Sequence, residues 1–364
     1  MKSYLEFERD IKVLEEELEK LKDPFNKDGI SEVNTEKISQ IQKDIDNKIK
    51  DSYKNLDDYQ KVQVARHEDR PKSLFYIENL FTNFIKLSGD RSFGEDESVI
   101  CGFGIFEGRS VCIIGQERGD GIEGRMRHNF GMVRSHGYRK VSRIVKLADR
   151  FNLPIFTFVD CAGADASPDS ENTGIFESIA SSIQIFMEVK VPIISILIGS
   201  GGSGGALAIA SANKVIAMSG SIYSVISPEG AASILFRDST KSSEAAKSMK
   251  LTANKVFEMG LVDEIVEEDI PAHRNRQQIV SSVRTALVKS LDEFKNFTRE
   301  EIFEHRKEKF KNIGKRKSFI DLSSVSKGIR RSNLIPSTKK ILFKFKKSFI
   351  IIALLILSAV LFLF

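Results

Sequence analysis

The stretch that decides the fold is "IGSGGSGGALAIASA", residues 198–212. Five glycines fall within seven residues, between an apolar run and a segment of small residues that is typical of a helix. Because glycine has no side chain, another group can approach its main chain closely. That group could be a phosphate, a cofactor, an oxyanion or another helix, and the rest of the sequence has to distinguish among these.

The sequence gives little support for a nucleotide-binding site. Gly199, Gly201 and Gly204 match G-x-G-x-x-G after a strand, but the dinucleotide motif also needs an acidic residue about 20 residues further on. The next strand ends in "AMSGS", and no acid follows before Glu229. A Walker loop is excluded, since no Gly-Lys-Ser/Thr follows. The remaining functional interpretation is an oxyanion hole made by amides at a helix N-terminus. The alternative is tight packing of the helix on the strand.

Composition narrows the class of protein. The chain has 364 residues and a formal net charge of +5, much of it near the C-terminus, so no nucleic-acid partner is expected. Cys101, Cys112 and Cys161 show no C-x-x-C pairing, which argues against a disulfide framework or a zinc site and favours a reduced, cytoplasmic setting.

The first 70 residues predict a helical region. Two amphipathic stripes stand on either side of a break at Pro24 and Gly29, and a second helix is expected to open near Asn34 or Thr35. The stripes consist of Ile11, Leu14, Leu18 and Leu21, and of Ile38, Ile41, Ile45 and Ile49. This hairpin could cover its stripes by packing on the body of the chain or by forming a subunit interface.

Residues 71–320 alternate strand and helix patterns, which indicates an α/β domain with covered sheets. A β-hairpin is expected to turn at Glu107 and Gly108, and Ser227 with Pro228 is typical of a helix start. Further strands are expected at 153–160, 191–199 and 214–220, and helices at 137–152, 175–189 and 206–212.

The C-terminal part has a different composition. Residues 321–347 are polar, basic and rich in serine, as in a linker, and 348–364 contain no charge. At about 1.5 Å per residue, the latter covers roughly 25 Å, slightly short of a membrane core of about 30 Å. Lysines at 344, 346 and 347 stand on its N-terminal side only. The pattern predicts a transmembrane tail anchor with the body on the cytoplasmic face, against the alternative of a helix docked in a soluble core.

No conventional side-chain catalysis can be argued from spacing. The five histidines are scattered, and no Ser-His-Asp set or metal set stands out: His67, His128, His136, His273 and His305. Chemistry through main-chain electrostatics is consistent with this set of residues.

The chain resembles the carboxyltransferase alpha subunits of bacterial acetyl-CoA carboxylase over about residues 4–315. The motifs that carry the resemblance occur in the family's order: "ARHEDRP", "GDRSFGED", "NFGM", "GYRK", "GSGGSGGALAIA", "YSVISPEGAASILF" and "AHRN". The resemblance implies the crotonase (ClpP/crotonase-like) fold, a spiral of stacked ββα units, here with an N-terminal helical hairpin and the C-terminal segment.

It also implies an activity shared between subunits. Carboxybiotin on a biotin carboxyl carrier protein would meet acetyl-CoA between alpha and beta subunits of an α2β2 assembly, yielding malonyl-CoA for fatty acid synthesis. ATP would be used only by the biotin carboxylase component, and no metal is expected in this chain. By the resemblance, the catalytic amides are those of Gly204 and Gly205, while Gly201 and Gly202 shape the loop.

Further substrate contacts are expected at Gly163 and Ala164, which match the family's pattern. The basic stretch "RMRHNFGMVRSHGYRK" offers Arg125 and Arg127, together with Arg134, Arg139 and Lys140, to a carboxylate or to the phosphates of coenzyme A. The alternative for each is a solvated basic face.

The chain departs from the family after the "FVD" strand. "CAGADAS", residues 161–167, lacks the family's two prolines, tyrosine and last glycine, so a rigid loop is expected to become flexible and acidic at Asp165. Ile175 replaces a glutamine, and the turn in "GMVRSHG" has become basic. These departures motivate a second hypothesis, a membrane-tethered scaffold without activity. A propionyl-CoA carboxyltransferase, or a crotonase-type hydratase or isomerase using Glu177 or Glu229, are further alternatives.

Overall fold

The computed structural model describes residues 3–22, 25–26, 29–30 and 35–315. The chain divides into two compact units, Met1–Lys311 and Asn312–Phe364, and the following concerns the first. The predicted linker (321–347) and tail anchor (348–364) lie outside the described residues. Among those that are described, no helix has the length and apolarity needed to cross a membrane. The domain boundaries predicted at 70 and 320 stay predictions.

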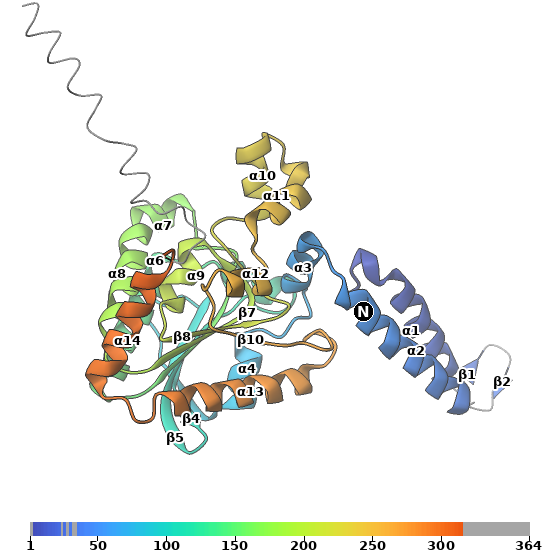
Figure 1. Ribbon diagram of the computed structural model, residues 1–364, viewed down its shortest axis with the longest axis horizontal. Helices are drawn as coiled ribbons and strands as arrows, with labels where there is room; N and C mark the ends of the chain where they lie inside the picture. Colours follow the sequence, from blue (N-terminus) through green and yellow to red (C-terminus); the bar gives the residue numbers. More distant parts are fainter. Residues whose placement is uncertain (1–2, 23–24, 27–28, 31–34, 316–364) are drawn as a thin grey trace, which may run out of the picture. The chain divides into compact units, whose positions relative to one another are not determined.

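The described part of the chain alternates strands and helices after a helical N-terminal region (Figure 1). The strands are β1 (Phe25–Asn26), β2 (Gly29–Ile30), β3 (Thr82–Lys86), β4 (Val99–Phe106), β5 (Arg109–Gln116), β6 (Ile155–Cys161), β7 (Ile193–Gly202), β8 (Lys214–Met218), β9 (Ile222–Ser224) and β10 (Glu264–Val266). The α-helices are α1 (Arg9–Lys22), α2 (Thr35–Lys54), α3 (Asp58–Ala65), α4 (Ser73–Leu80), α5 (Gly121–Arg127), α6 (Ser135–Arg150), α7 (Pro168–Asn172), α8 (Ile175–Glu188), α9 (Ser203–Ala210), α10 (Pro228–Phe236), α11 (Ser242–Met249), α12 (Ala253–Glu258), α13 (Arg276–Glu293) and α14 (Arg299–Asn312). Short 3-10 helices are η1 (Glu6–Glu8), η2 (Asn129–Gly131) and η3 (Ser239–Lys241).

One mixed sheet of eight strands forms the centre of this unit, in the order β10-β8-β7-β6-β5-β4-β3, with β9 paired to β7. The strands from β5 through β10 that pair along this path are parallel, while β3, β4 and β5 pair antiparallel. The hairpin between β4 and β5 is confirmed: Glu107 and Gly108 both have positive φ, 45° and 74°, as a tight two-residue hairpin turn requires.

Helices cover both faces of the sheet, so the inner strands β6 and β7 are buried along their whole length. Against one face pack α6, α8 and α9, and against the other α4 and α13 (Figure 1). On the first face Val141 and Ile144 of α6 are fully buried, and on the second Val283 and Leu287 of α13 are. The prediction of an α/β domain with covered sheets is confirmed.

The N-terminal hairpin covers most of its own apolar surface. The stripes of α1 and α2 face each other and form one cluster of buried residues, Ile11, Leu18, Ile41, Ile45 and Ile49, against which Ile270 also packs. The two stripes therefore need no subunit interface to be buried, because they cover each other.

The glycine stretch is divided differently from the prediction. β7 continues through Gly202 instead of ending at Gly199, and α9 begins at Ser203 instead of Ala206. Because β9 pairs with β7 at residues 200–202, the ladder extends into the glycines. The predicted start of α10 is confirmed, since the Ser227 hydroxyl accepts a hydrogen bond from the Gly230 amide at 3.1 Å.

Candidate functional site

A cavity of about 580 Å³ lies where β6 and β7 end and α9 begins. We call it the glycine cavity. Four predicted site residues, Gly163, Ala164, Gly204 and Gly205, are brought together in its wall. The other lining residues are Ala162, Asp165, Ala166, Ser167, Glu171, Ile175, Phe176, Ile179, Ser203, Val225, Ile226 and Ser227.

Close packing explains most of the glycines. A Cβ built on Gly202 would lie 2.2 Å from the Ala162 carbonyl oxygen, and one on Gly205 would lie 2.5 Å from the Ala164 nitrogen. At Gly201 a Cβ would meet Tyr223 at 2.9 Å. These distances are shorter than real Cβ contacts, so the alternative of tight packing is correct for these positions.

Gly204 is different from its neighbours. A Cβ there would meet only a methyl group of Ile179, at 3.6 Å, which is ordinary van der Waals contact. The residue lines the glycine cavity in the first turn of α9, where no side chain caps the helix. The first amides of a helix have no intrahelical acceptor and lie at the positive end of its dipole. Close packing therefore does not require a glycine at position 204, whose main chain lines the cavity.

The main chain of Gly163 and Ala164 also lines the glycine cavity. Ala164 follows Gly163, whose φ is 154°, and the Ala164 amide donates no hydrogen bond within the described residues. Gly201 and Gly202 are buried in β7 and do not line the cavity, and their role in shaping the loop stays a prediction. The main chain at Gly204 and Ala164 thus lies in one cavity wall, together with the carboxylates of Asp165 and Glu171.

The Gly205 carbonyl is fixed by two donors that the sequence did not reveal. It accepts from the Gln116 side-chain amide at 2.8 Å and from the Tyr138 hydroxyl at 3.1 Å. Both donors are buried, and burial raises the pKa of Tyr138 well above its ordinary value, so the phenol stays protonated. The only signal was the position of Tyr138 inside the "GYRK" motif.

The loop predicted to be flexible and acidic is ordered in the structure. Residues 168–172 form α7, capped by Ser167, and the Asp165 carboxylate accepts hydrogen bonds from Ser167 at 2.7 Å and Ser170 at 2.6 Å. Burial raises the pKa of Asp165, but these hydrogen bonds outweigh it and the net shift is downward. The expectation of a flexible loop was wrong, because the hydroxyls of Ser167 and Ser170 hold the Asp165 carboxylate in place.

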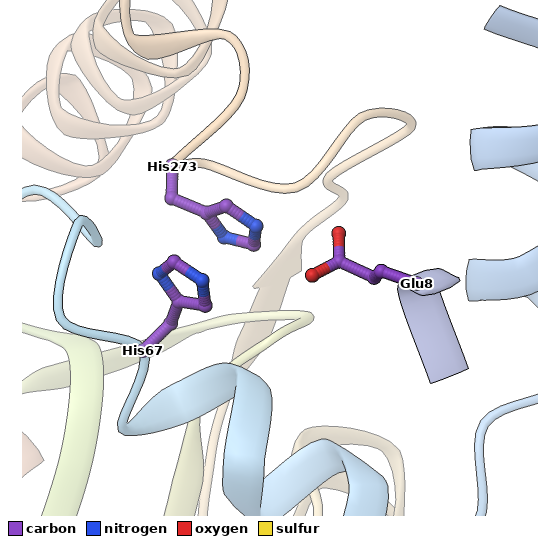
Figure 2. A group of neighbouring side chains, drawn as sticks. All are labelled: Glu8, His67 and His273. Carbon is purple, nitrogen blue, oxygen red and sulfur yellow. The ribbon is translucent and has the colours of Figure 1, made fainter. Parts of the chain in front are cut away.

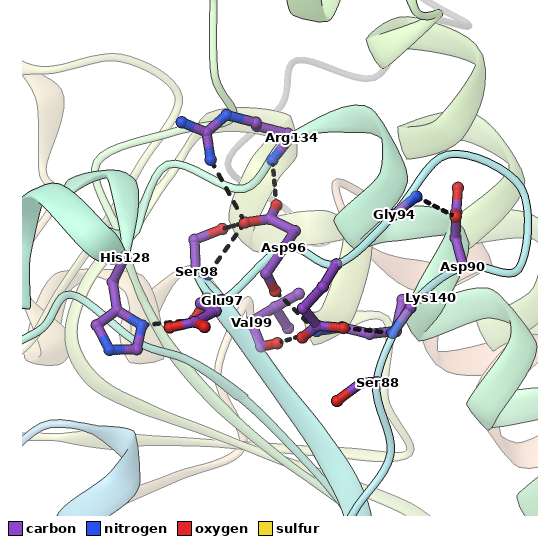
Figure 3. Close-up of polar contacts among 12 residues, drawn as sticks. Ser88, Asp90, Gly94, Asp96, Glu97, Ser98, Val99, His128, Arg134 and Lys140 are labelled. Carbon is purple, nitrogen blue, oxygen red and sulfur yellow. Dashed lines mark hydrogen bonds and ion pairs between the residues drawn. The ribbon is translucent and has the colours of Figure 1, made fainter.

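Two members of the basic stretch are structural. Lys140 is fully buried, and its ammonium donates to Glu95 Oε1 at 2.6 Å and to the main-chain oxygens of Asp96 and Val99 (Figure 3). Arg139 donates to Asp90 at 2.9 Å. The motifs "GDRSFGED" and "GYRK" thus bind each other through these two side chains, of which Lys140 is fully buried and Arg139 partly exposed.

Arg125 and Arg127 lie on α5 and do not line the glycine cavity. Arg125 is 3.4 Å from Glu68 and lines a separate cavity of about 90 Å³, while Arg127 is 3.6 Å from Glu123 one turn away. A substrate contact for these two residues stays a prediction.

The carboxylates considered for hydratase chemistry are also outside the cavity wall. Glu177 accepts from the Ser181 hydroxyl at 2.5 Å, and Glu229 pairs with Arg66 at 2.8 Å. The acids that do line the glycine cavity are Asp165 and Glu171. Sequence spacing did not single out Glu171.

One group of side chains among the described residues has metal-ligand chemistry: Glu8, His67 and His273 (Figure 2). Glu8 and His67 are hydrogen-bonded and His273 Nε2 contacts the Tyr53 hydroxyl at 3.3 Å, whereas His273 Nδ1 is buried without a hydrogen-bond partner among the described residues. Glu8 Oε1 accepts from Tyr53 and Arg274, and His67 contacts the Ser3 oxygen at 3.2 Å through Nε2 and the Asp69 amide at 3.1 Å through Nδ1. The two imidazoles stack with centroids 3.9 Å apart. The group joins the N-terminal hairpin to the body.

Comparisons with known proteins identify the family of the chain. Residues 4–314 match a family described as acetyl co-enzyme A carboxylase carboxyltransferase-like. The acetyl-coenzyme A carboxylase carboxyl transferase subunit alpha of Pelagibacter ubique (strain HTCC1062) is 54% identical over 339 residues, 92% of each chain. The protein of the same name from Brucella ovis (strain ATCC 25840 / 63/290 / NCTC 10512) is 45% identical over 86% of this chain and 99% of its own.

A solved structure supports the fold alone. It is a Pseudomonas malonate decarboxylase hetero-tetramer in complex with coenzyme A, one chain of which is 18% identical, with a TM-score of 0.51, covering 64% of this chain and 91% of its own. Motifs, sheet and close relatives lead to one conclusion: the chain belongs to the acetyl co-enzyme A carboxylase carboxyltransferase-like family.

Proposed function

We propose that this chain is the alpha half of a biotin-dependent carboxyltransferase, which moves a carboxyl group from carboxybiotin to acetyl-CoA and yields malonyl-CoA. The observation that carries the proposal is the open main chain of Gly204 in the glycine cavity, in a member of this family. The crotonase-type spiral is part of the proposal.

The cavity has the composition expected for biotin. Its volume of about 580 Å³ is within the range of small-molecule sites, and Ala164, Ile175 and Ile179 give it apolar walls. When bound, carboxybiotin would supply the carboxyl group and a ureido oxygen that gains negative charge as that group leaves. The amides of Gly204 and of Ala164 or Gly205 would stabilise this charge by about 3 kcal/mol for each donor. No titrating residue of the chain is required.

The rim of the glycine cavity suits a protein partner. Large apolar side chains lie exposed there, among them Phe176 at 72% and Val225 at 85% of their surface. Contiguous exposed apolar groups mark interaction surfaces. We assign this rim to a beta subunit in an α2β2 assembly. The biotin carrier protein would then bring its biotin to the cavity, while ATP is used only by a biotin carboxylase.

Reconstitution tests the function. The full chain should be inactive alone and should catalyse carboxyl transfer between malonyl-CoA and free biotin once a beta subunit is added. In the forward reaction, from carboxybiotin to an acyl-CoA, comparing the rates with acetyl-CoA and propionyl-CoA as acceptors identifies the preferred acyl-CoA substrate. An assembled pair without any transfer would support the scaffold hypothesis instead. The hydratase alternative is not supported for the two residues on which it rested, since Glu177 and Glu229 do not line the cavity.

Location is also part of the proposal. The charge-free run at 348–364 supports a tether to the cytoplasmic face of a membrane. The full chain should sediment with membranes and resist extraction by salt, whereas a chain ending at residue 347 should stay in the supernatant. Equal distribution of both chains would refute the tether.

A further inference from the structure

Ser203 stands where β7 passes into α9, with its backbone in the left-handed region at φ 58°. A residue with a Cβ is disfavoured there, whereas glycine adopts the conformation freely. Its neighbours Gly201, Gly202, Gly204 and Gly205 are all glycine. A further glycine would therefore relieve strain, and the presence of a serine side chain requires an explanation.

The side chain of Ser203 is exposed and lines the glycine cavity, and its hydroxyl makes no hydrogen bond with any described residue. The other two serines of the cavity wall are engaged. The Ser167 hydroxyl bonds to Asp165, and the Ser227 hydroxyl accepts from the Gly230 amide. Among these three lining hydroxyls, that of Ser203 is the one that neither donates nor accepts a hydrogen bond within the described residues, so both its proton and its lone pairs are available to a ligand.

A nucleophilic role does not fit. Residues 201–205 read G-G-S-G-G, the pattern of the strained strand-to-helix turn that presents a serine nucleophile. Such a serine needs a base within hydrogen-bonding reach. No imidazole or carboxylate of the described chain bonds to Ser203. The hydroxyl is available as a donor but is not activated for attack.

We propose that Ser203 is a substrate-contacting residue, whose hydroxyl donates a hydrogen bond to an oxygen of the ureido or carboxylated ureido group held beside the Gly204 amide. This inference rests on the proposed function. A donor next to a main-chain amide strengthens its bond as the acceptor oxygen gains charge, so the contact is stronger in the transition state than in the ground state.

Two substitutions separate this role from backbone conformation. Ser203→Gly removes the hydroxyl and relieves the left-handed strain, whereas Ser203→Ala removes the hydroxyl and keeps the strain. Each variant is assembled as the full chain with the beta subunit and assayed for carboxyl transfer from malonyl-CoA to free biotin. Both should lower kcat roughly 10- to 100-fold, with the unfolding temperature of Ser203→Gly equal to or above that of the wild type.

Glu107→Gly is the matched control. Glu107 has φ 45° in the turn before β5, and it lies at the edge of the sheet where β6 and β7 begin, opposite Ser203. This variant gains the same backbone freedom and also loses the exposed ion pair of Glu107 with Arg284, which contributes less than about 1 kcal/mol, so it should keep the wild-type kcat. Wild-type kcat in Ser203→Gly would overturn the inference, as would an equal fall in the control. An inactive wild-type assembly would refute the proposed function, and this inference with it.

Discussion

The Tyr138 hydroxyl of α6 donates a hydrogen bond to the Gly205 carbonyl of α9 at 3.1 Å, which joins the "GYRK" motif to the glycine turn. The same carbonyl accepts from Gln116, so the first turn of α9 is held from two directions. The "GDRSFGED" motif supports this contact, because Lys140, two residues after Tyr138, is anchored on Glu95. The two motifs therefore position the first turn of α9, which lines the cavity.

Removing the phenol should loosen this turn. We expect Tyr138→Phe to lower the free energy of unfolding by about 1 kcal/mol, the net value of one hydrogen bond, and to lower kcat more than it raises KM. Chemical denaturation and steady-state kinetics measure the two effects. Since Gln116 still bonds the carbonyl, Tyr138→Phe with Gln116→Leu should cost more than the sum of the single changes. Simple additivity would show that the two donors act independently.

Gly204 and Gly205 should respond differently to a methyl group. Gly204→Ala meets only ordinary contact, so stability should hold or rise by up to about 1 kcal/mol, while the methyl narrows the cavity and lowers carboxyl transfer. Gly205→Ala places a Cβ 2.5 Å from the Ala164 nitrogen, and should cost about 1–3 kcal/mol of stability as well as activity. A stable, fully active Gly204→Ala would contradict the placement of the substrate at this amide.

The buried pair of Arg70 and Glu268 should be essential to folding. Both side chains are 3% exposed and lie 2.6 Å apart, and Arg70 also donates to the Ile198 carbonyl just before the glycines. Arg70→Met leaves a buried carboxylate without its partner, at a cost of about 3–5 kcal/mol. Thermal unfolding measures this loss. Lys289→Met, which breaks the exposed pair with Glu264, serves as the control and should change stability by less than about 1 kcal/mol.

The stacked imidazoles should make stability depend on pH. Burial, reinforced by His67 and nearby arginines, lowers the pKa of His273 to about 2, and burial also lowers the pKa of His67. The charged groups that face the two rings are Glu8, Glu68, Asp69, Arg70, Arg274 and Arg276.

Because the unfolded chain binds these protons near pH 6.5 and the folded chain does not, stability is full above that pH and falls below it. The slope is at most about 1.4 kcal/mol per pH unit for each histidine. Denaturation of the wild type and of His273→Phe at pH 7.5, 6.5 and 5.5 measures it. The free energy of unfolding should depend less steeply on pH in His273→Phe than in the wild type. Equal slopes would show that groups other than His273 cause the pH dependence.

The sequence by itself determined two kinds of feature: local turns and helix caps, and the ordered motifs that identify the family. The turn at Glu107 and Gly108, the cap at Ser227 and the glycine-rich site follow from residue types at adjacent positions, and the family follows from ordered motifs. Local chemistry fixes such features before any distant contact forms.

Tertiary structure decided which of the glycines is open, since this depends on atoms from other segments, such as Ala164 beside Gly205. Lys140, which the sequence offered as a ligand contact, is buried in the structure and bound to Glu95. The loop around Asp165 is held by hydrogen bonds such as that from Ser170. The two donors that hold the Gly205 carbonyl are distant in sequence: Tyr138 stands 67 positions before Gly205, and Gln116 stands 89 positions before it. No periodicity encodes them, because only the folded sheet brings α6, β5 and α9 together.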